Sequence, residues 1–482
     1  MYKVHLNLKN LNKYFVALGL SALVVGCKAP SVIETTAKTV VPEAYNSSKD
    51  STNTATVQWR NFFTDTNLQN LIDTALQNNQ ELMITLQEIE IAKNEVRLKK
   101  AALFPTVGLR AGSGIEKVGR YTSQGAGDAS TEITPGKEMP DPLGDFIVGA
   151  YANWEVDIWH KLHNSKKAAL TRYLATVEGK NFVLTNLVAE VANSYYELQA
   201  LDNQLLIVQQ NIAIQKNALE IVQWQKEAAK ETELAVQKFK AEVLKSRSLE
   251  FDIRQNIKET ENKINFLLGR YPQEIPRDKA SVLSIIPKTI AAGIPSQLLS
   301  NRPDIKQAEL ELVAAKIDVK VARAEFFPSL EISAGVGFNA FKPSYLFRTP
   351  ESLLYNLVGD LAAPLINRNA IKAEFNSANA RQLQALYNYE RTVLNAYLEV
   401  SNQLSKIDNL EKSYDLRSQQ VAALDQSINV SNDLFKSARV DYLEVLLTQR
   451  DALETKLELI ETKRDQLNAV VNVYKDLGGG WK

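Results

Sequence analysis

The sequence of 482 residues has little cysteine and histidine and no excess of charge of either sign. Its single cysteine, Cys27, excludes an internal disulfide and a cysteine nucleophile within the folded body. Lys plus Arg equals Asp plus Glu at 56 each, so a nucleic-acid partner has no electrostatic basis. With three histidines, no glycine-rich phosphate loop and no nucleophile elbow, the sequence offers no catalytic constellation, and we expect no enzyme.

Long apolar runs are also missing. After residue 27 no stretch of 18 or more apolar residues occurs, so we expect no transmembrane helix in the mature chain, and any crossing of a membrane must use strands. Residues 1–26 are typical of an export signal, because three lysines precede the apolar segment Phe15–Val25. An apolar content of 45% is enough for a sizeable core, so we expect a folded protein.

The end of the signal predicts a lipid anchor. Val24-Val25-Gly26-Cys27 resembles the bacterial lipobox, in which the cysteine is lipidated and becomes the mature N-terminus. Lys28 replaces the aspartate that retains lipoproteins in the inner membrane, which favours the outer membrane. The alternative is an ordinary signal followed by an incidental cysteine. We expect no cofactor other than this covalent lipid.

Two segments about 220 residues apart carry the same pattern, and a repeat at that distance indicates duplication of a whole structural unit. The first segment begins at Asn79-Gln80-Glu81-Leu82 and ends at Phe104-Pro105. The second begins at Arg302-Pro303-Asp304-Ile305 and ends at Phe327-Pro328. Each segment is predicted as a helix that stops at the proline, because proline cannot continue a helix.

The hydrophobic period changes after each proline. Alternation of apolar and small polar residues predicts strands at about 106–116, 145–157, 330–339 and 354–364, long enough to cross a bilayer when tilted. A helical period then persists over two long stretches in each half. These stretches are about 160–228 and 233–268, then about 369–438 and 440–476. Both halves are therefore predicted as helix, strand, strand, long helix, long helix.

The same patterns predict the domain boundaries. A signal peptide covers 1–26, and an N-terminal tether rich in Ser, Thr and Val covers 27–56. The first repeat covers 57–280, an equatorial connector covers 281–300, and the second repeat covers 301–482.

Four strands cannot close a barrel in a membrane, where unpaired backbone groups at a sheet edge cost several kcal/mol each. Two copies would give eight strands, a barrel filled by its own side chains. Three copies give twelve strands with room for an aqueous lumen. The expected fold is mainly α with a small membrane β-barrel part, and a trimer is the smallest assembly that conducts; four or more copies stay open.

Several phrases, in order along the chain, resemble the TolC-like outer membrane efflux protein family and, within it, the NodT-like lipoprotein branch. The phrases are Trp59-Arg60-Asn61-Phe62-Phe63, Asn153-Trp154-Glu155-Val156-Asp157, Phe266-Leu267-Leu268-Gly269, Asn301-Arg302-Pro303-Asp304-Ile305, Tyr442-Leu443-Glu444-Val445-Leu446-Leu447-Thr448-Gln449-Arg450 and Leu477-Gly478-Gly479-Gly480-Trp481.

The resemblance implies a homotrimer with a 12-stranded barrel in the outer membrane and a 12-helix periplasmic tunnel. It also implies a passive exit duct for drugs, docked to a periplasmic adaptor and a proton-driven inner-membrane transporter. Two alternatives remain. One is a type I secretion duct for polypeptides, and the other, from a different class, is a lipid-anchored coiled-coil scaffold or adhesin.

The resemblance implies two kinds of site. The helix-to-helix turns would contact the adaptor, although alanine stands here where relatives usually carry glycine; the alternative is a solvated helix end. The corresponding residues are Ala228, Ala229, Lys230 and Glu231 in the first turn and Lys436, Ser437, Ala438 and Arg439 in the second. Asn432 and Asp433 are candidates for a periplasmic gate, where threefold symmetry would bring identical charges together. An ordinary exposed aspartate explains Asp433 equally well.

His160 and His163 lie at a spacing that can hold a metal ion. The sequence shows no third ligand, so we interpret them as incidental and expect no metal site.

Overall fold

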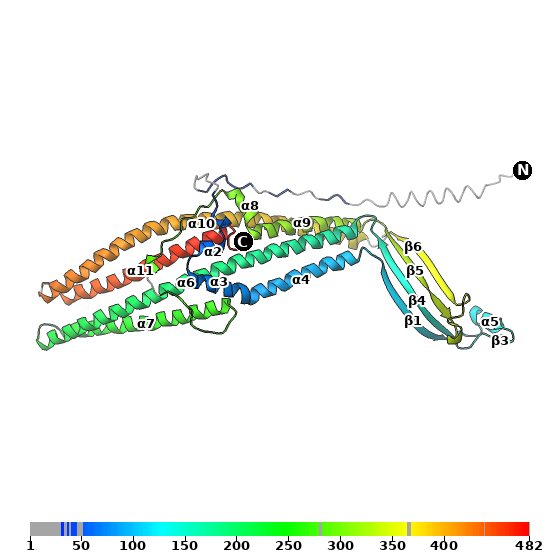
Figure 1. Cartoon of the computed structure of the whole chain (residues 1–482), viewed down its shortest axis with the longest axis horizontal. Coiled ribbons are helices and arrows are strands. Elements are labelled where there is room, and N and C mark those ends of the chain that lie inside the picture. The colour runs from blue at the N-terminus through cyan, green and yellow to red at the C-terminus, as the bar shows by residue number, and fades with distance from the viewer. Residues whose placement is uncertain are drawn as a thin grey trace. The chain divides into compact units, whose positions relative to one another are not determined.

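The computed structural model describes residues 30–32, 36–37, 40–45, 52–278, 282–363, 368–437 and 439–481 (Figure 1). Cys27 and Ala438 lie outside these residues. The chain divides into two compact units. Unit 1 comprises Met1–Thr36, Ile91–Tyr173 and Leu310–Leu386, and unit 2 comprises Ala37–Glu90, Leu174–Glu309 and Tyr387–Lys482.

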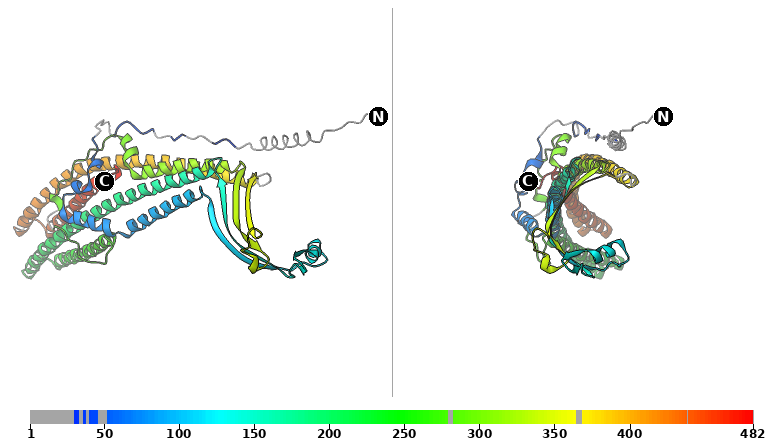
Figure 2. Two further views of the ribbon diagram at one scale, coloured as in Figure 1. Left: turned by 45° about the vertical axis from the view of Figure 1, so that its right-hand side comes forward. Right: turned by 90° about the vertical axis from the view of Figure 1, so that its right-hand side faces the viewer.

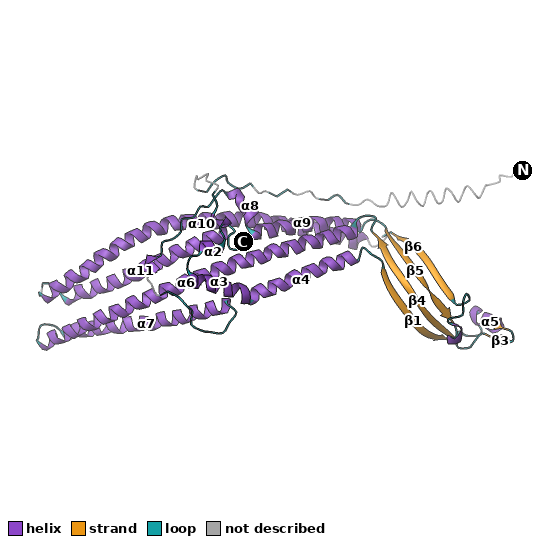
Figure 3. Ribbon diagram, in the orientation of Figure 1, coloured by secondary structure: helices purple, strands orange, loops and turns teal. Residues whose placement is uncertain are grey.

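Unit 1 contains a sheet of four antiparallel strands (Figure 3). The strands are β1 (Thr106–Glu116), β4 (Leu143–Val156), β5 (Ser329–Ala340) and β6 (Leu353–Ala362), in the order β1-β4-β5-β6. The central pair joins the two halves of the sequence, with Ala152 opposite Ala334. The four strands curve together (Figure 2). Within the described residues β1 and β6 each have one edge without a partner strand.

The connection between β1 and β4 contains short elements that the sequence did not predict. They are α5 (Ser123–Ser130), β2 (Glu132–Thr134) and β3 (Lys137–Glu138). Thr122 begins α5, because its Oγ1 accepts a hydrogen bond from the Gly125 amide at 3.1 Å. The shorter connection between β5 and β6 contains the 3-10 helix η4 (Pro343–Tyr345).

The helices repeat between the two halves as predicted. α4 (Gln80–Ala101) precedes β1 and α9 (Pro303–Ala324) precedes β5, and each has 22 residues. The sheet is followed in one half by α6 (Lys161–Glu227) and α7 (Glu233–Leu267), and in the other by α10 (Arg368–Lys436) and α11 (Tyr442–Asp476). α6 and α10 have 67 and 69 residues, and α7 and α11 have 35 each. In the part of the chain that the structure describes, no helix has both the length and the hydrophobicity of a transmembrane span.

Unit 2 also contains short elements around its main core. They are η1 (Thr54–Thr56), α2 (Trp59–Phe62), α3 (Thr66–Asn78), η2 (Val282–Ser284), η3 (Pro295–Gln297) and α8 (Leu298–Asn301). The ring of Tyr474 stacks on Phe62 with centroids 4.0 Å apart. Asp65 begins α3 by accepting hydrogen bonds from its first amides, and its second oxygen accepts from the buried Tyr195 hydroxyl at 2.7 Å. The carboxylate of Asp65 thus links the start of α3 to the buried side chain of Tyr195.

The return helices α7 and α11 end in the same way. Gly269 and Gly478 follow them with φ of +66° and +90°. The amides of Arg270 and Gly479 each donate back to a carbonyl five residues earlier, at 3.0 and 2.9 Å. This is the glycine-terminated helix end in which a left-handed residue satisfies the last carbonyls.

Candidate functional site

The edge strands of the sheet expose large apolar side chains. Leu109 on β1 is 87% exposed and Leu357 on β6 is 78% exposed. Other exposed apolar residues are Val107 and Ile115 on β1 and Leu354, Tyr355 and Leu361 on β6. All of these residues except Leu354 lie on the same face of the sheet. Exposed apolar side chains next to an unpaired strand edge are typical of a surface that lipid or another chain covers.

The turn from α6 to α7 is the first predicted docking tip. Ala229 has φ +55°. Its amide donates to Lys226 O at 2.9 Å, and the Lys230 amide donates to Gln225 O at 2.8 Å. Lys226 and Glu233 form an ion pair across the turn. Ala229 therefore occupies the left-handed position that glycine favours at a helix end. The Lys230 amide still donates to a carbonyl five residues earlier, as the Arg270 amide does after Gly269.

The turn from α10 to α11 has the same pattern in its described residues. The Arg439 amide donates to Leu434 O at 2.9 Å, as the Lys230 amide does to Gln225 O. The Ser437 hydroxyl donates to Asp433 O at 2.8 Å. Lys436, Ser437 and Arg439 are exposed. The two turns are therefore copies of each other.

Unit 2 brings the two helix pairs together near these turns. Val222, Val236 and Phe239 of the first pair are buried, and Tyr442 of the second pair packs against them. The Phe239 and Tyr442 rings lie 6.5 Å apart. This apolar cluster fixes the two turns relative to each other.

Two large apolar side chains beside the first turn were not singled out from the sequence. Trp224 is 64% exposed and Leu234 is 60% exposed. A tryptophan on the outward side of the heptad pattern was the signal that could have identified them, because exposed tryptophan is enriched at protein interfaces.

The gate candidates lie one turn before the end of α10. Asn432 is half-buried, and the Asp433 side chain is 79% exposed. Asp433 lies 3.9 Å from the Lys436 ammonium, measured between Oδ1 and Nζ. The carboxylate is thus available to another chain or to solvent, with one cation nearby.

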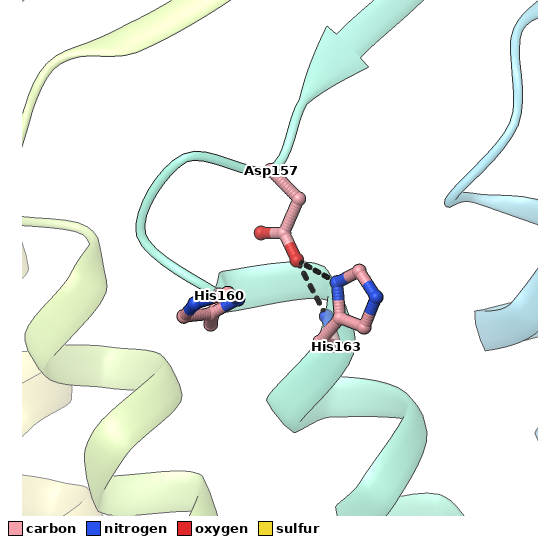
Figure 4. Close-up of side chains that lie close together, drawn as sticks. All are labelled: Asp157, His160 and His163. Carbon is pink, nitrogen blue, oxygen red and sulfur yellow. Dashed lines mark hydrogen bonds and ion pairs between the residues drawn. The ribbon is translucent and has the colours of Figure 1, made fainter.

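Residues between β4 and α6 bring both histidines next to a carboxylate (Figure 4). Asp157 begins α6, because its two oxygens accept hydrogen bonds from the Leu162 and His163 amides at 2.9 and 2.8 Å. His163 Nδ1 lies 2.5 Å from Asp157 Oδ2, and the His160 and His163 rings are 5.8 Å apart. The sequence showed no third ligand because Asp157 was placed in the preceding strand, which ends at Val156.

Comparison with known proteins supports the channel interpretation. Residues 71–270 and 294–479 match the outer membrane efflux protein family, so the chain belongs to that family. The pyoverdine export outer membrane protein OpmQ of Pseudomonas aeruginosa is 29% identical over 425 residues, which cover 88% of each chain. The probable outer membrane lipoprotein SilC of Salmonella typhimurium is 28% identical over 447 residues, covering 92% of this chain and 93% of SilC.

A crystal structure of CusC has the same fold, with a TM-score of 0.80 and 25% identity, covering 94% of this chain and 100% of that chain. The predicted resemblance to the TolC-like family is thereby confirmed, as is the predicted mainly helical fold with two repeats. The protein is an outer membrane efflux channel and not an enzyme.

Proposed function

We propose that this protein is the passive exit duct of a tripartite efflux system and conducts small molecules from the periplasm to the exterior. The four-stranded sheet with two unpaired edges carries this proposal. In a homotrimer, β1 of one copy pairs with β6 of the next, and twelve strands close without an edge in lipid. Val107, Leu109 and Ile115 of β1 and Tyr355, Leu357 and Leu361 of β6 share one face of the sheet, and this face is proposed to contact lipid.

The lipid anchor and the cargo belong to the same proposal. Cys27 carries the covalent lipid and holds the N-terminus at the outer membrane, in agreement with the lipoprotein relative SilC. The relatives transport different compounds, since OpmQ exports pyoverdine and CusC belongs to a cation efflux system. The channel is therefore proposed to accept small molecules as a class, with selectivity set by the inner-membrane transporter, proposed to be proton-driven.

The two turns are proposed to dock the periplasmic adaptor. Ala228, Ala229 and Lys230 are exposed and Glu231 is half-buried, while Lys436, Ser437 and Arg439 are exposed in the second turn. The exposed side chains of Trp224 and Leu234 flank the first turn in the sequence. An exposed apolar residue beside exposed charges is typical of a protein contact, with the aromatic ring as the anchor.

Site-directed photo-crosslinking in the host bacterium tests the docking. A photo-reactive amino acid at Lys230 is expected to trap a periplasmic adaptor. The control position is Tyr271, which is 93% exposed and lies away from the turns in the sequence. Equal capture of the adaptor at both positions, or none at Lys230, contradicts the docking site.

Asp433 is proposed to form a cation-sensitive gate with its symmetry copies, next to Asn432. Three carboxylates close to one axis bind cations and disfavour anions. Asp433→Asn is expected to change the single-channel conductance and to weaken the preference for cations in a planar bilayer. Asp415→Asn, an exposed aspartate elsewhere on α10, is the control. Identical conductance in wild type and Asp433→Asn contradicts the gate.

A further inference from the structure

Three side chains of metal-ligating type converge where β4 passes into α6. Asp157, His160 and His163 follow one another at intervals of three residues. One ligand atom from each lies within 4.8 Å of the other two (Figure 4). Both histidines are exposed to solvent, so an ion could reach them.

Helix capping explains two of these residues but not the third. Asp157 accepts the Leu162 and His163 amides, and His163 pairs with its carboxylate. The His160 ring has no hydrogen-bond or ion-pair partner among the described residues, and it packs edge-to-face against the His163 ring. Its backbone has φ +57°, in the left-handed region that residues with a Cβ rarely adopt.

The local charge permits a cation. The ammonium of Lys161, the residue that follows His160, is paired with Glu155 at 2.5 Å and lies 3.7 Å from Glu325. The Leu162 and His163 amides, whose positive partial charge would oppose a cation, donate to Asp157. The carboxylate of Asp157 supplies the negative charge at the site.

We propose that Asp157, His160 and His163 bind one divalent first-row transition-metal ion, with Zn²⁺ as the simplest case. Two imidazoles and one carboxylate suit such ions, and a three-residue set leaves a position for water. Metal–ligand bonds of about 2.0–2.2 Å place ligand atoms about 3.3 Å apart. His163 Nδ1, now 2.5 Å from Asp157, must therefore move away, and ligand atoms that now lie up to 4.8 Å apart must approach one another. The ion would hold the end of β4 to the start of α6.

Zinc titration of the purified full-length protein tests this site. The protein is purified in detergent through a tag that contains no histidine, is stripped with a chelator, and is titrated with Zn²⁺ against a chromophoric competitor. Saturation at one Zn²⁺ per chain is expected, together with a rise in melting temperature, because an ion that binds only the folded state stabilises it.

His160→Asn is the decisive variant, because asparagine accepts a left-handed backbone but lacks the imidazole. It is expected to weaken Zn²⁺ binding at least tenfold and to melt like the wild type without metal. Glu325→Gln changes a carboxylate near the site but outside the proposed ligand set, and it should bind Zn²⁺ like the wild type. Absence of saturable binding, or equal binding by His160→Asn, overturns the proposal. Neither outcome bears on conduction, so the channel function stands or falls separately.

Discussion

The guanidinium of Arg302 donates a hydrogen bond of 2.9 Å to the backbone carbonyl of Asp476, the last residue of α11. In the first repeat Asn79 takes the equivalent place, and its side-chain amide donates to the carbonyl of Leu267 at 2.9 Å. In each repeat, the side chain of the residue just before α4 or α9 therefore donates a hydrogen bond to the last carbonyl of α7 or α11. The duplication seen in the sequence is also a duplication of contacts.

Arg302→Ala is expected to lower the free energy of unfolding by about 2–4 kcal/mol, because it leaves two half-buried carboxylates and a buried backbone carbonyl without their partner. Arg302 is 5% exposed and binds both oxygens of Asp304, at 3.0 and 2.7 Å, and Glu399 at 2.8 Å. Burial disfavours its charge, but these carboxylates outweigh burial and raise its pKa. Arg302→Lys should also destabilise, since an ammonium cannot form the two parallel bonds to Asp304.

Chemical denaturation of the purified protein measures both variants. Arg381→Ala is the control, because Arg381 pairs with Glu374 at the surface and exposed pairs contribute little. Equal losses for Arg302→Ala and Arg381→Ala would show that the buried network does not stabilise unit 2.

Gly269→Ala is expected to destabilise the protein by at least about 1 kcal/mol. The residue has φ +66°, and a Cβ there would lie 2.2 Å from the Asn78 carbonyl oxygen. Gly127→Ala is the matched control, because a Cβ at Gly127 meets nothing within 4 Å. Thermal melting of the two variants compares them; a tolerated Gly269→Ala would refute the close approach of the end of α7 to the last residue of α3.

Asp476 is expected to make stability depend on pH. Burial raises the pKa of its carboxyl above the ordinary 3.8, the charge of Lys475 opposes this, and that of Glu399 adds to it. The folded state thus holds the proton more tightly than the unfolded chain, so the contribution of Asp476 falls as pH rises from 3.8 through the folded pKa.

Asp476→Asn removes that titration. The melting temperature of Asp476→Asn relative to wild type should therefore be higher at pH 7 than at pH 4. The comparison is made in one detergent and one salt concentration. A difference that stays constant or reverses between the two pH values would contradict the raised pKa.

Ala229→Gly is expected to stabilise the first turn by about 1 kcal/mol, since glycine adopts a positive φ without the steric cost that alanine has. Ala228→Gly should have the opposite effect, because Ala228 does not have a positive φ. Glycine there relieves no strain in the folded state and increases the conformational entropy of the unfolded chain. Hydrogen exchange of the amides around 225–235 measures the local effect. Faster exchange in Ala229→Gly would refute the strained alanine.

The strands and long helices were predictable because their signal is local. Period-two alternation after Pro105 and Pro328 predicted strands that the structure places at Thr106–Glu116 and Ser329–Ala340. The missing tip glycine raised doubt about the turn, but the hydrogen bonds around Ala229 keep the left-handed geometry. The backbone hydrogen bonds of the turn thus hold Ala229 at a positive φ, although alanine disfavours this conformation.

Contacts between distant residues were not predictable. The bond from Arg302 to Asp476 joins positions 174 residues apart, and no periodicity indicates which carbonyl the guanidinium meets. Asp157 was missed as a neighbour of His160 because the strand was predicted one residue too long. Its approach to the histidines depends on the left-handed turn at His160, which no sequence pattern indicated.

The most direct test of the channel is the mass and single-channel conductance of protein purified from outer membranes in mild detergent. Three chains per particle and a small, cation-preferring conductance in a planar bilayer are the predicted result, since twelve strands enclose an aqueous lumen. A monomer or dimer that never conducts would contradict closure of the sheet by β1 and β6 of neighbouring copies.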